Sequence, residues 1–128
     1  MIAHLTLLVS DFAKSKVFYA AVLDTLGYRN NMQYDAAAGF NDGKNTDFWI
    51  SKTRSVVPTH VAFEAASRQQ VEAFYNAGLA AGGQDNGGPG YRDYWPGYFA
   101  AFLRDPDGNN IEAVWYDYSK AKSGQTAL

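Results

Sequence analysis

The chain has 128 residues, a net charge of −2 and no cysteine. This length fits one domain with a hydrophobic core, whereas either half alone would be marginal. The near-neutral charge offers no basic surface for nucleic acid or anionic membrane, and the lack of cysteine excludes disulfides and thiolate metal sites. Because no apolar run reaches the length of a membrane span and no signal-peptide pattern is present, we expect a cytoplasmic protein that binds neither nucleic acid nor membrane.

The first half of the chain predicts a strand, a helix and three further strands, from the alternation and the spacing of its apolar residues. The strands are expected at residues 2–9, 28–34, 36–41 and 46–51. Ser10 or Asp11 caps the helix, which ends near Leu26, before Gly27. This half therefore reads as a βαβββ unit.

The second half repeats this order. Strands are expected at residues 59–65, 98–104 and 110–116. Ser67 and Gln70 form a capping box for a helix whose core face includes Val71, Phe74 and Leu79. A glycine-rich stretch follows this helix, and an Asp-Pro-Asp-Gly turn joins the last two strands. We expect one α+β domain over residues 1–118, built of modules 1–55 and 56–118, with a flexible tail over 119–128.

The two histidines of the chain occupy equivalent positions of an internal duplication. His4 and His60 are 56 residues apart, and the same offset places four more residues of the first half on identical residues of the second. These are Phe18, Tyr19, Leu23 and Gly27, which match Phe74, Tyr75, Leu79 and Gly83. Such a register indicates two copies of one supersecondary unit. A site between the copies would bring both imidazoles together.

Glu112 completes a candidate metal site. It projects from the middle of the last predicted strand, where a carboxylate among apolar neighbours needs a partner. Two neutral imidazoles and one carboxylate bind a divalent cation and leave positions open for substrate. Taken singly, a strand histidine such as His4 or His60 is more often a hydrogen-bonded core residue than a ligand, and Glu112 could face solvent. The repeat, which pairs both histidines, favours the metal site.

The sequence resembles the vicinal oxygen chelate superfamily, which contains glyoxalases, bleomycin resistance proteins and extradiol dioxygenases. The resemblance covers nearly the whole chain. It rests on Ala3-His4, Asp11, Phe18-Tyr19, residues 59–63 and, most strongly, the run from Asp105 to Glu112. It implies that the modules curl into a half-barrel of mixed sheet with the helices outside. It also implies a divalent metal ion (Zn, Ni, Co, Mn or Fe) bound by His4, His60 and Glu112.

One position departs from the family pattern. Glyoxalase I carries a second glutamate on the last strand of its first module, and Trp49 falls at or beside this position, with Asp47 two residues away. The resemblance therefore implies a glyoxalase-like metalloenzyme of unassigned substrate, of lyase, isomerase or transferase type. Glu112, Glu64 and Tyr98 are the candidate catalytic residues, with a metal-bound hydroxide as a further base. The alternative is a non-catalytic binding or resistance protein that uses the same groove.

Aromatic residues are the candidates for the substrate pocket. Trp49, Tyr94, Trp95 and Tyr98 would shape it, the last three within a crowded aromatic segment after the glycine-rich stretch. This segment could form a lid over a small-molecule ligand or pack at a subunit interface. Because the open strand edges and aromatic surface would be covered by a second chain, we expect a homodimer.

Overall fold

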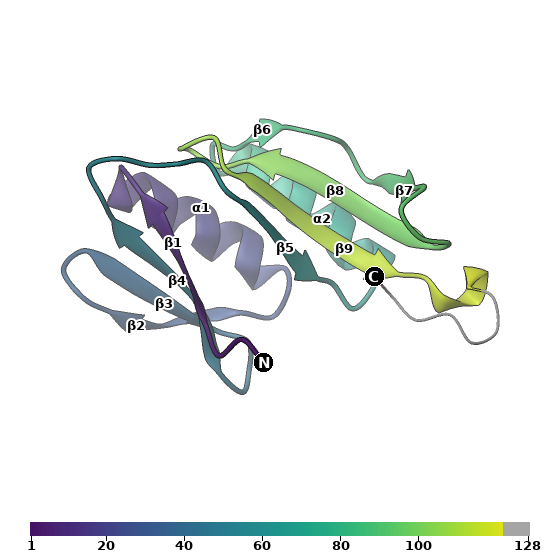
Figure 1. Cartoon of the computed structure of the whole chain (residues 1–128), viewed down its shortest axis with the longest axis horizontal. Coiled ribbons are helices and arrows are strands. Elements are labelled where there is room, and N and C mark those ends of the chain that lie inside the picture. The colour runs from purple at the N-terminus through teal and green to yellow at the C-terminus, as the bar shows by residue number, and fades with distance from the viewer. Residues whose placement is uncertain (122–128) are drawn as a thin grey trace.

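The computed structural model describes residues 1–121, and each module forms one mixed sheet with one helix (Figure 1). The first module consists of β1 (Leu5–Val9), α1 (Phe12–Asp24), β2 (Arg29–Gln33), β3 (Ala37–Asn41) and β4 (Thr46–Lys52). The second consists of β5 (His60–Glu64), α2 (Arg68–Ala80), β6 (Gln84–Asp85), β7 (Gly90–Arg92), β8 (Tyr98–Arg104) and β9 (Asn110–Tyr116), followed by the 3-10 helix η1 (Tyr118–Lys120). The predicted α+β architecture of two βαβββ modules is confirmed.

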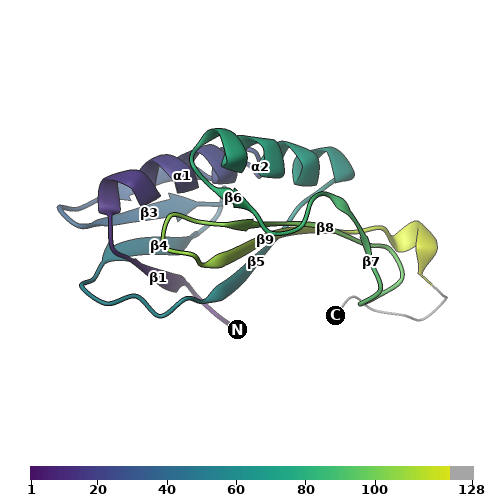
Figure 2. The same cartoon turned by 90° about the horizontal axis from the view of Figure 1, so that it is seen from above.

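The two sheets repeat the same topology. The first has the order β1-β4-β3-β2 and the second the order β5-β9-β8-β6, with β7 also paired to β8. In each sheet the first strand of the module runs parallel to the last. Both helices lie on the same side of the sheets (Figure 2), and over residues 1–121 the sheets form no closed barrel. The opposite side of both sheets is thus left without helices.

One hydrophobic core joins the modules on the helical side. The alternation of β1 buries Leu7 and Val9 there, and the same core contains Phe48 of β4 and Phe63 of β5. The rings of Phe48 and Phe63 lie 5.1 Å apart, edge to face, across the junction of the modules. Because this contact crosses the modules, they are expected to unfold together rather than as separate halves.

Helix α2 has the predicted core face at Val71 and Phe74 but not at Leu79. Leu79, expected on its core face, is 40% exposed, whereas Val71, Phe74 and Gly78 are buried. Gly78 lies so close to Leu103 of β8 that a Cβ atom would overlap that side chain. Close approach at the glycine directs the neighbouring Leu79 away from the sheet.

The Asp-Pro-Asp-Gly turn binds the second module to the first. Buried Asp105 accepts hydrogen bonds from the Tyr19 hydroxyl (2.5 Å) and from the backbone N–H groups of Asp107 and Asn109 (2.9 Å each). The backbone N–H of Ser10, just before α1, donates to the Asp107 carboxylate at 3.0 Å. The turn that begins β9 is therefore fixed by residues of the first module.

The glycine-rich stretch after α2 is more ordered than a simple loop. It contains β6 and β7, which both pair with β8, and the guanidinium of Arg92 donates to the carbonyls of Gly88 and Gly90 at 2.8 Å. Helix η1 takes up the first positions of the predicted tail, and residues 122–128 lie outside the described part of the chain. In the described part, neither helix is long and apolar enough to cross a membrane.

Candidate metal centre

The helix-free face of the second sheet carries the predicted chemistry. On β5 the alternation turns Phe63 into the core and leaves His60 and Glu64 exposed. On β9, Ile111 and Ala113 belong to the core, so that Glu112 faces the other way. The side chain of Glu112 is only 3% exposed, and this buried carboxylate requires partners.

His60 is the first partner of Glu112. Its Nε2 lies 3.1 Å from Oε1 of Glu112, and its Nδ1 lies 3.0 Å from the backbone carbonyl oxygen of Asn110. The imidazole ring stacks on Phe102 of β8 at 6.3 Å and 22°. The carbonyl and the ring thus hold the imidazole in one orientation although its side chain is 49% exposed.

This geometry fits a cation between His60 and Glu112. A carbonyl oxygen only accepts hydrogen bonds, so Nδ1 carries a proton, and Nε2 faces the carboxylate oxygen either as a second N–H donor or with a lone pair. Two acceptors at 3.1 Å need a proton or a metal ion between them. Ligands about 2.1 Å from one divalent ion lie roughly 3.0–3.4 Å apart, which matches the observed separation.

Tyr98 is the second partner of Glu112. Its hydroxyl donates to Oε2, so the two carboxylate oxygens have different partners. Tyr98 itself is buried, with its ring edge-on to Tyr94 at 5.2 Å and to Tyr116 at 5.6 Å. Burial, followed by the hydrogen bond to Glu112, raises the pKa of Tyr98 well above its usual value. The phenol is therefore a neutral donor at physiological pH.

His4 does not reach this pair within one chain. It precedes β1 in the first sheet and is exposed. Over residues 1–121, no group of three or more His, Asp or Glu side chains is close enough to hold a metal ion. The predicted meeting of His4, His60 and Glu112 is therefore found for two of the three residues only.

Trp49 occupies the position of the first module that corresponds to Glu112. Trp49 lies opposite Thr6 in β1, and Glu112 lies opposite Ala62, the residue that the 56-residue offset assigns to Thr6. The indole stacks on Tyr34 at 6.1 Å and 19°, and it covers Gly39, where a Cβ atom would lie 2.9 Å from the ring. An aromatic surface thus replaces a second carboxylate.

Asp47 does not compensate for the missing carboxylate on that face. The pairing of β3 with β4 shifts between Phe40 and Asn41, next to Asp47. The Asp47 carboxylate accepts a hydrogen bond from the Tyr28 hydroxyl at 3.4 Å, and the Tyr28 ring packs edge-on against Phe63 of the core. Its nearest polar partner thus comes from a residue that packs on the core.

Of the other predicted residues, Tyr94 and Trp95 lie beside Tyr98. Tyr94 is 61% exposed, whereas Trp95 is buried and packs edge-on against Tyr116 and Tyr118. Glu64 is exposed, and burial, followed by the Glu64 carboxylate, raises the pKa of Tyr116. Trp49 is on the other sheet. Of the four predicted pocket residues, only Tyr98 contacts Glu112.

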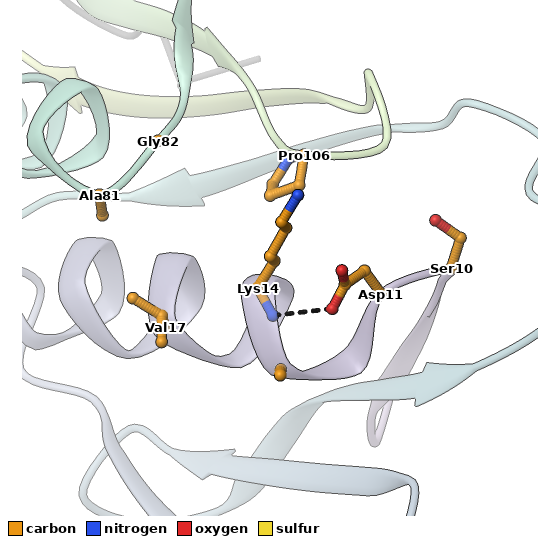
Figure 3. A pocket seen from close by; sticks show the side chains of 8 residues that line it. Ser10, Asp11, Lys14, Val17, Ala81, Gly82 and Pro106 are labelled. Atoms are coloured by element: carbon orange, nitrogen blue, oxygen red, sulfur yellow. Dashed lines mark hydrogen bonds between the residues drawn. The ribbon is translucent and has the colours of Figure 1, made fainter.

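A surface groove of about 790 Å³ lies away from these residues. Figure 3 shows it between the start of α1, the end of α2 and the turn at Pro106, with Lys14 and Val17 among the lining residues. None of the predicted site residues lines it. The groove is built by helical elements and a turn, whereas the candidate centre is built by strands.

The fold agrees with comparisons to known proteins. Residues 1–113 match the family model of the Glyoxalase/Bleomycin resistance protein/Dioxygenase superfamily, and the chain belongs to this family. A search of curated proteins gave no significant match. A glyoxalase/bleomycin resistance protein from Albidiferax ferrireducens T118 is 32% identical, with a TM-score of 0.77 over 88% of this chain and 96% of that one.

Two more distant structures share the fold. A glyoxalase-related enzyme from Fulvimarina pelagi is 16% identical, with a TM-score of 0.74 over 99% of both chains. A glyoxalase/bleomycin resistance protein/dioxygenase family enzyme from Burkholderia phytofirmans PsJN is 17% identical, with a TM-score of 0.71 over 90% of this chain and 98% of that one. These likenesses establish the architecture, and the superfamily includes enzymes.

Proposed function

We propose that the protein is a glyoxalase-like metalloenzyme in which His60 and Glu112 of one chain and His4 of a second copy bind a divalent metal ion. The pair of Nε2 and Oε1 at 3.1 Å, with His60 oriented by a backbone carbonyl, is the observation that carries this proposal. A histidine fixed through its other nitrogen is typical of metal ligands. A homodimer with two-fold symmetry would form two equivalent centres.

The residues present fit the chemistry of such an ion. A bound divalent ion would act as a Lewis acid on adjacent oxygens of a small substrate. Buried Glu112 supplies negative charge, while His60 remains half exposed and leaves the centre open on its solvent side. Glu64, on the same strand as His60, is the candidate proton acceptor, and Trp49 and Tyr94 are the candidate walls of the substrate pocket. The reaction would be of lyase, isomerase or transferase type.

Metal content tests the proposal directly. The purified protein is stripped with a chelator, titrated with Zn²⁺, Ni²⁺, Co²⁺ and Mn²⁺ by calorimetry, and assayed for bound metal after gel filtration. We expect about one ion per chain, lost in His60→Gln and Glu112→Gln but retained in Glu64→Gln, which removes a carboxylate from the same face. Equal metal content in all four proteins, or none in the unaltered protein, contradicts the proposal.

Mixing two inactive variants tests whether the centre is shared. His4→Gln and Glu112→Gln homodimers would each lack both centres. In a mixed dimer, however, His4 of the Glu112→Gln chain meets His60 and Glu112 of its partner. After joint refolding at equal amounts we expect about one quarter of the centres to bind metal again. A site formed within one chain would regain none.

Sequestration of a planar ligand is the second candidate, and the geometry of Trp49 favours it. The indole is stacked on Tyr34 and lies over Gly39, so a pair of aromatic rings is held in place on this sheet. Aromatic ligands are added to the metal-free protein and its tryptophan fluorescence is measured. Quenching that is lost in Trp49→Leu but kept in Trp115→Phe supports binding without turnover. If an aromatic ligand binds only when metal is present, the metal site and the aromatic surface would instead belong to one binding site.

A further inference from the structure

We infer that Tyr98 is a positioning residue, whose hydroxyl holds one oxygen of Glu112 so that only the other oxygen is presented to the metal. This inference rests on the proposed function. It concerns how Glu112 would bind the ion: through Oε1 alone, in monodentate fashion. Tyr98 would not touch the substrate.

The hydrogen-bond pattern of Glu112 carries the inference. Oε1 faces Nε2 of His60 at 3.1 Å, and Oε2 accepts the hydroxyl of Tyr98. A free carboxylate can turn and offer both oxygens to a cation, which changes the coordination number and the space left for substrate. The phenol opposes this rotation because it would lose a charge-assisted hydrogen bond.

The side chain of Tyr98 spans several residues along the sheet to reach Glu112. Tyr98 pairs in register with Tyr116, four residues from Glu112 on β9, so its side chain must lean along the strands. Ala100 and Val114, both buried, lie between these positions and belong to the same apolar cluster as Tyr98. A small residue at position 100 leaves room for the phenol ring on this face.

The start of β8 fixes the tyrosine backbone. Gly97 has φ +90°, and a Cβ atom there would overlap the backbone of Asp117, so only glycine lets the chain close at this point. Tyr98 N–H donates to the carbonyl of Trp95 at 3.0 Å. The phenol is thus held by its backbone as well as by the rings of Tyr94 and Tyr116.

Replacement of the hydroxyl tests the inference with Co²⁺ as the probe. In Tyr98→Phe we expect Co²⁺ affinity to fall about 10- to 100-fold, as for other groups that orient metal ligands. We also expect weaker visible absorption bands, because a carboxylate that binds through both oxygens raises the coordination number. Tyr118→Phe, altered in a ring that packs on Trp95 and Tyr116, should match the unaltered protein in both measurements. Circular dichroism checks that each variant is folded.

Infrared spectroscopy of the unaltered protein tests the inference without any substitution at Tyr98. The infrared difference spectrum between metal-bound and metal-free protein contains carboxylate bands of Glu112, identified by their loss in Glu112→Gln. A wide separation of the two stretching bands indicates binding through one oxygen and is the expected result. A narrow separation, or a Tyr98→Phe variant with unchanged affinity and absorption, overturns the inference. Failure of the unaltered protein to bind Co²⁺ would instead overturn the proposed function, and the role of Tyr98 with it.

Discussion

The Tyr19 hydroxyl connects the first module to the turn that precedes β9. The loss of stability in Tyr19→Phe should show how much this contact contributes. In Tyr19→Phe, Asp105 loses the donor that lies 2.5 Å from its carboxylate but keeps the backbone donors of Asp107 and Asn109. A buried hydrogen bond to a charged group contributes about 1.5–3 kcal/mol. We therefore expect the free energy of unfolding at pH 7 to fall by this amount.

The duplication supplies a matched control. Tyr75 is the repeat equivalent of Tyr19, and its hydroxyl also donates to an aspartate, Asp85, at 2.9 Å, but this bond is exposed. Removing an exposed hydrogen bond changes stability by about 0.5 kcal/mol or less. Urea denaturation followed by circular dichroism should therefore separate Tyr19→Phe clearly from Tyr75→Phe.

Alkaline pH adds a second test of the same contact. Burial, then the Asp105 carboxylate, raises the pKa of Tyr19 well above its usual value near 10. Above pH 10 the unfolded state loses this proton while the folded state keeps it, so stability falls as pH rises, by about 1.4 kcal/mol per unit for one tyrosine. Tyr19→Phe does not have this pH dependence, so its stability deficit should shrink by about 1 kcal/mol between pH 10 and 11, because the unfolded tyrosine is half deprotonated at pH 10. A constant deficit, or equal effects of Tyr19→Phe and Tyr75→Phe at pH 7, would refute the reasoning.

Three further substitutions have expected costs. Gly39→Ala places a Cβ atom 2.9 Å from the Trp49 ring and should cost about 1–3 kcal/mol in urea titrations, with a shift of tryptophan emission. Gly97→Ala combines φ +90° with overlap on Asp117, so we expect it to melt well below the native protein in calorimetry. Ser67→Ala removes the acceptor that caps α2 and should cost about 1 kcal/mol, whereas Ser67→Asp should retain most of the stability.

The strands that carry the site could be predicted because local rules act strongly there. β8 and β9 have the predicted bounds, since each alternates on a buried core and a turn with strong sequence chemistry joins them. The orientation of α2 could not be predicted in full. The position of Leu79 depends on how closely Gly78 approaches Leu103, and this is a property of the packed structure.

The structure brings His60 and Glu112 together but leaves His4 apart from them in residues 1–121, so the metal site stays a prediction. A repeat fixes equivalent places within each module and leaves open whether the modules face each other within one chain. The role of Tyr98 as a partner of Glu112 was equally hidden. Its register partner is Tyr116, and the contact arises only because the side chain leans over Ala100 along the sheet.

Each module has a cross-strand pair with one aromatic ring, at equivalent positions of the repeat. In the first module the ring belongs to the last strand, and in the second it belongs to the neighbouring strand. Trp49 of β4 lies opposite Gly39, whereas Glu112 of β9 lies opposite Phe102, whose ring stacks on His60. Trp49→Glu alone should thus leave a void over Gly39 and cost about 2–4 kcal/mol in urea denaturation. Adding Gly39→Phe restores the ring from the other strand, as in the second module, and we expect it to recover part of this loss. If the double variant is less stable than Trp49→Glu, a phenylalanine at position 39 does not pack as Phe102 does in the second module, and the expectation is wrong.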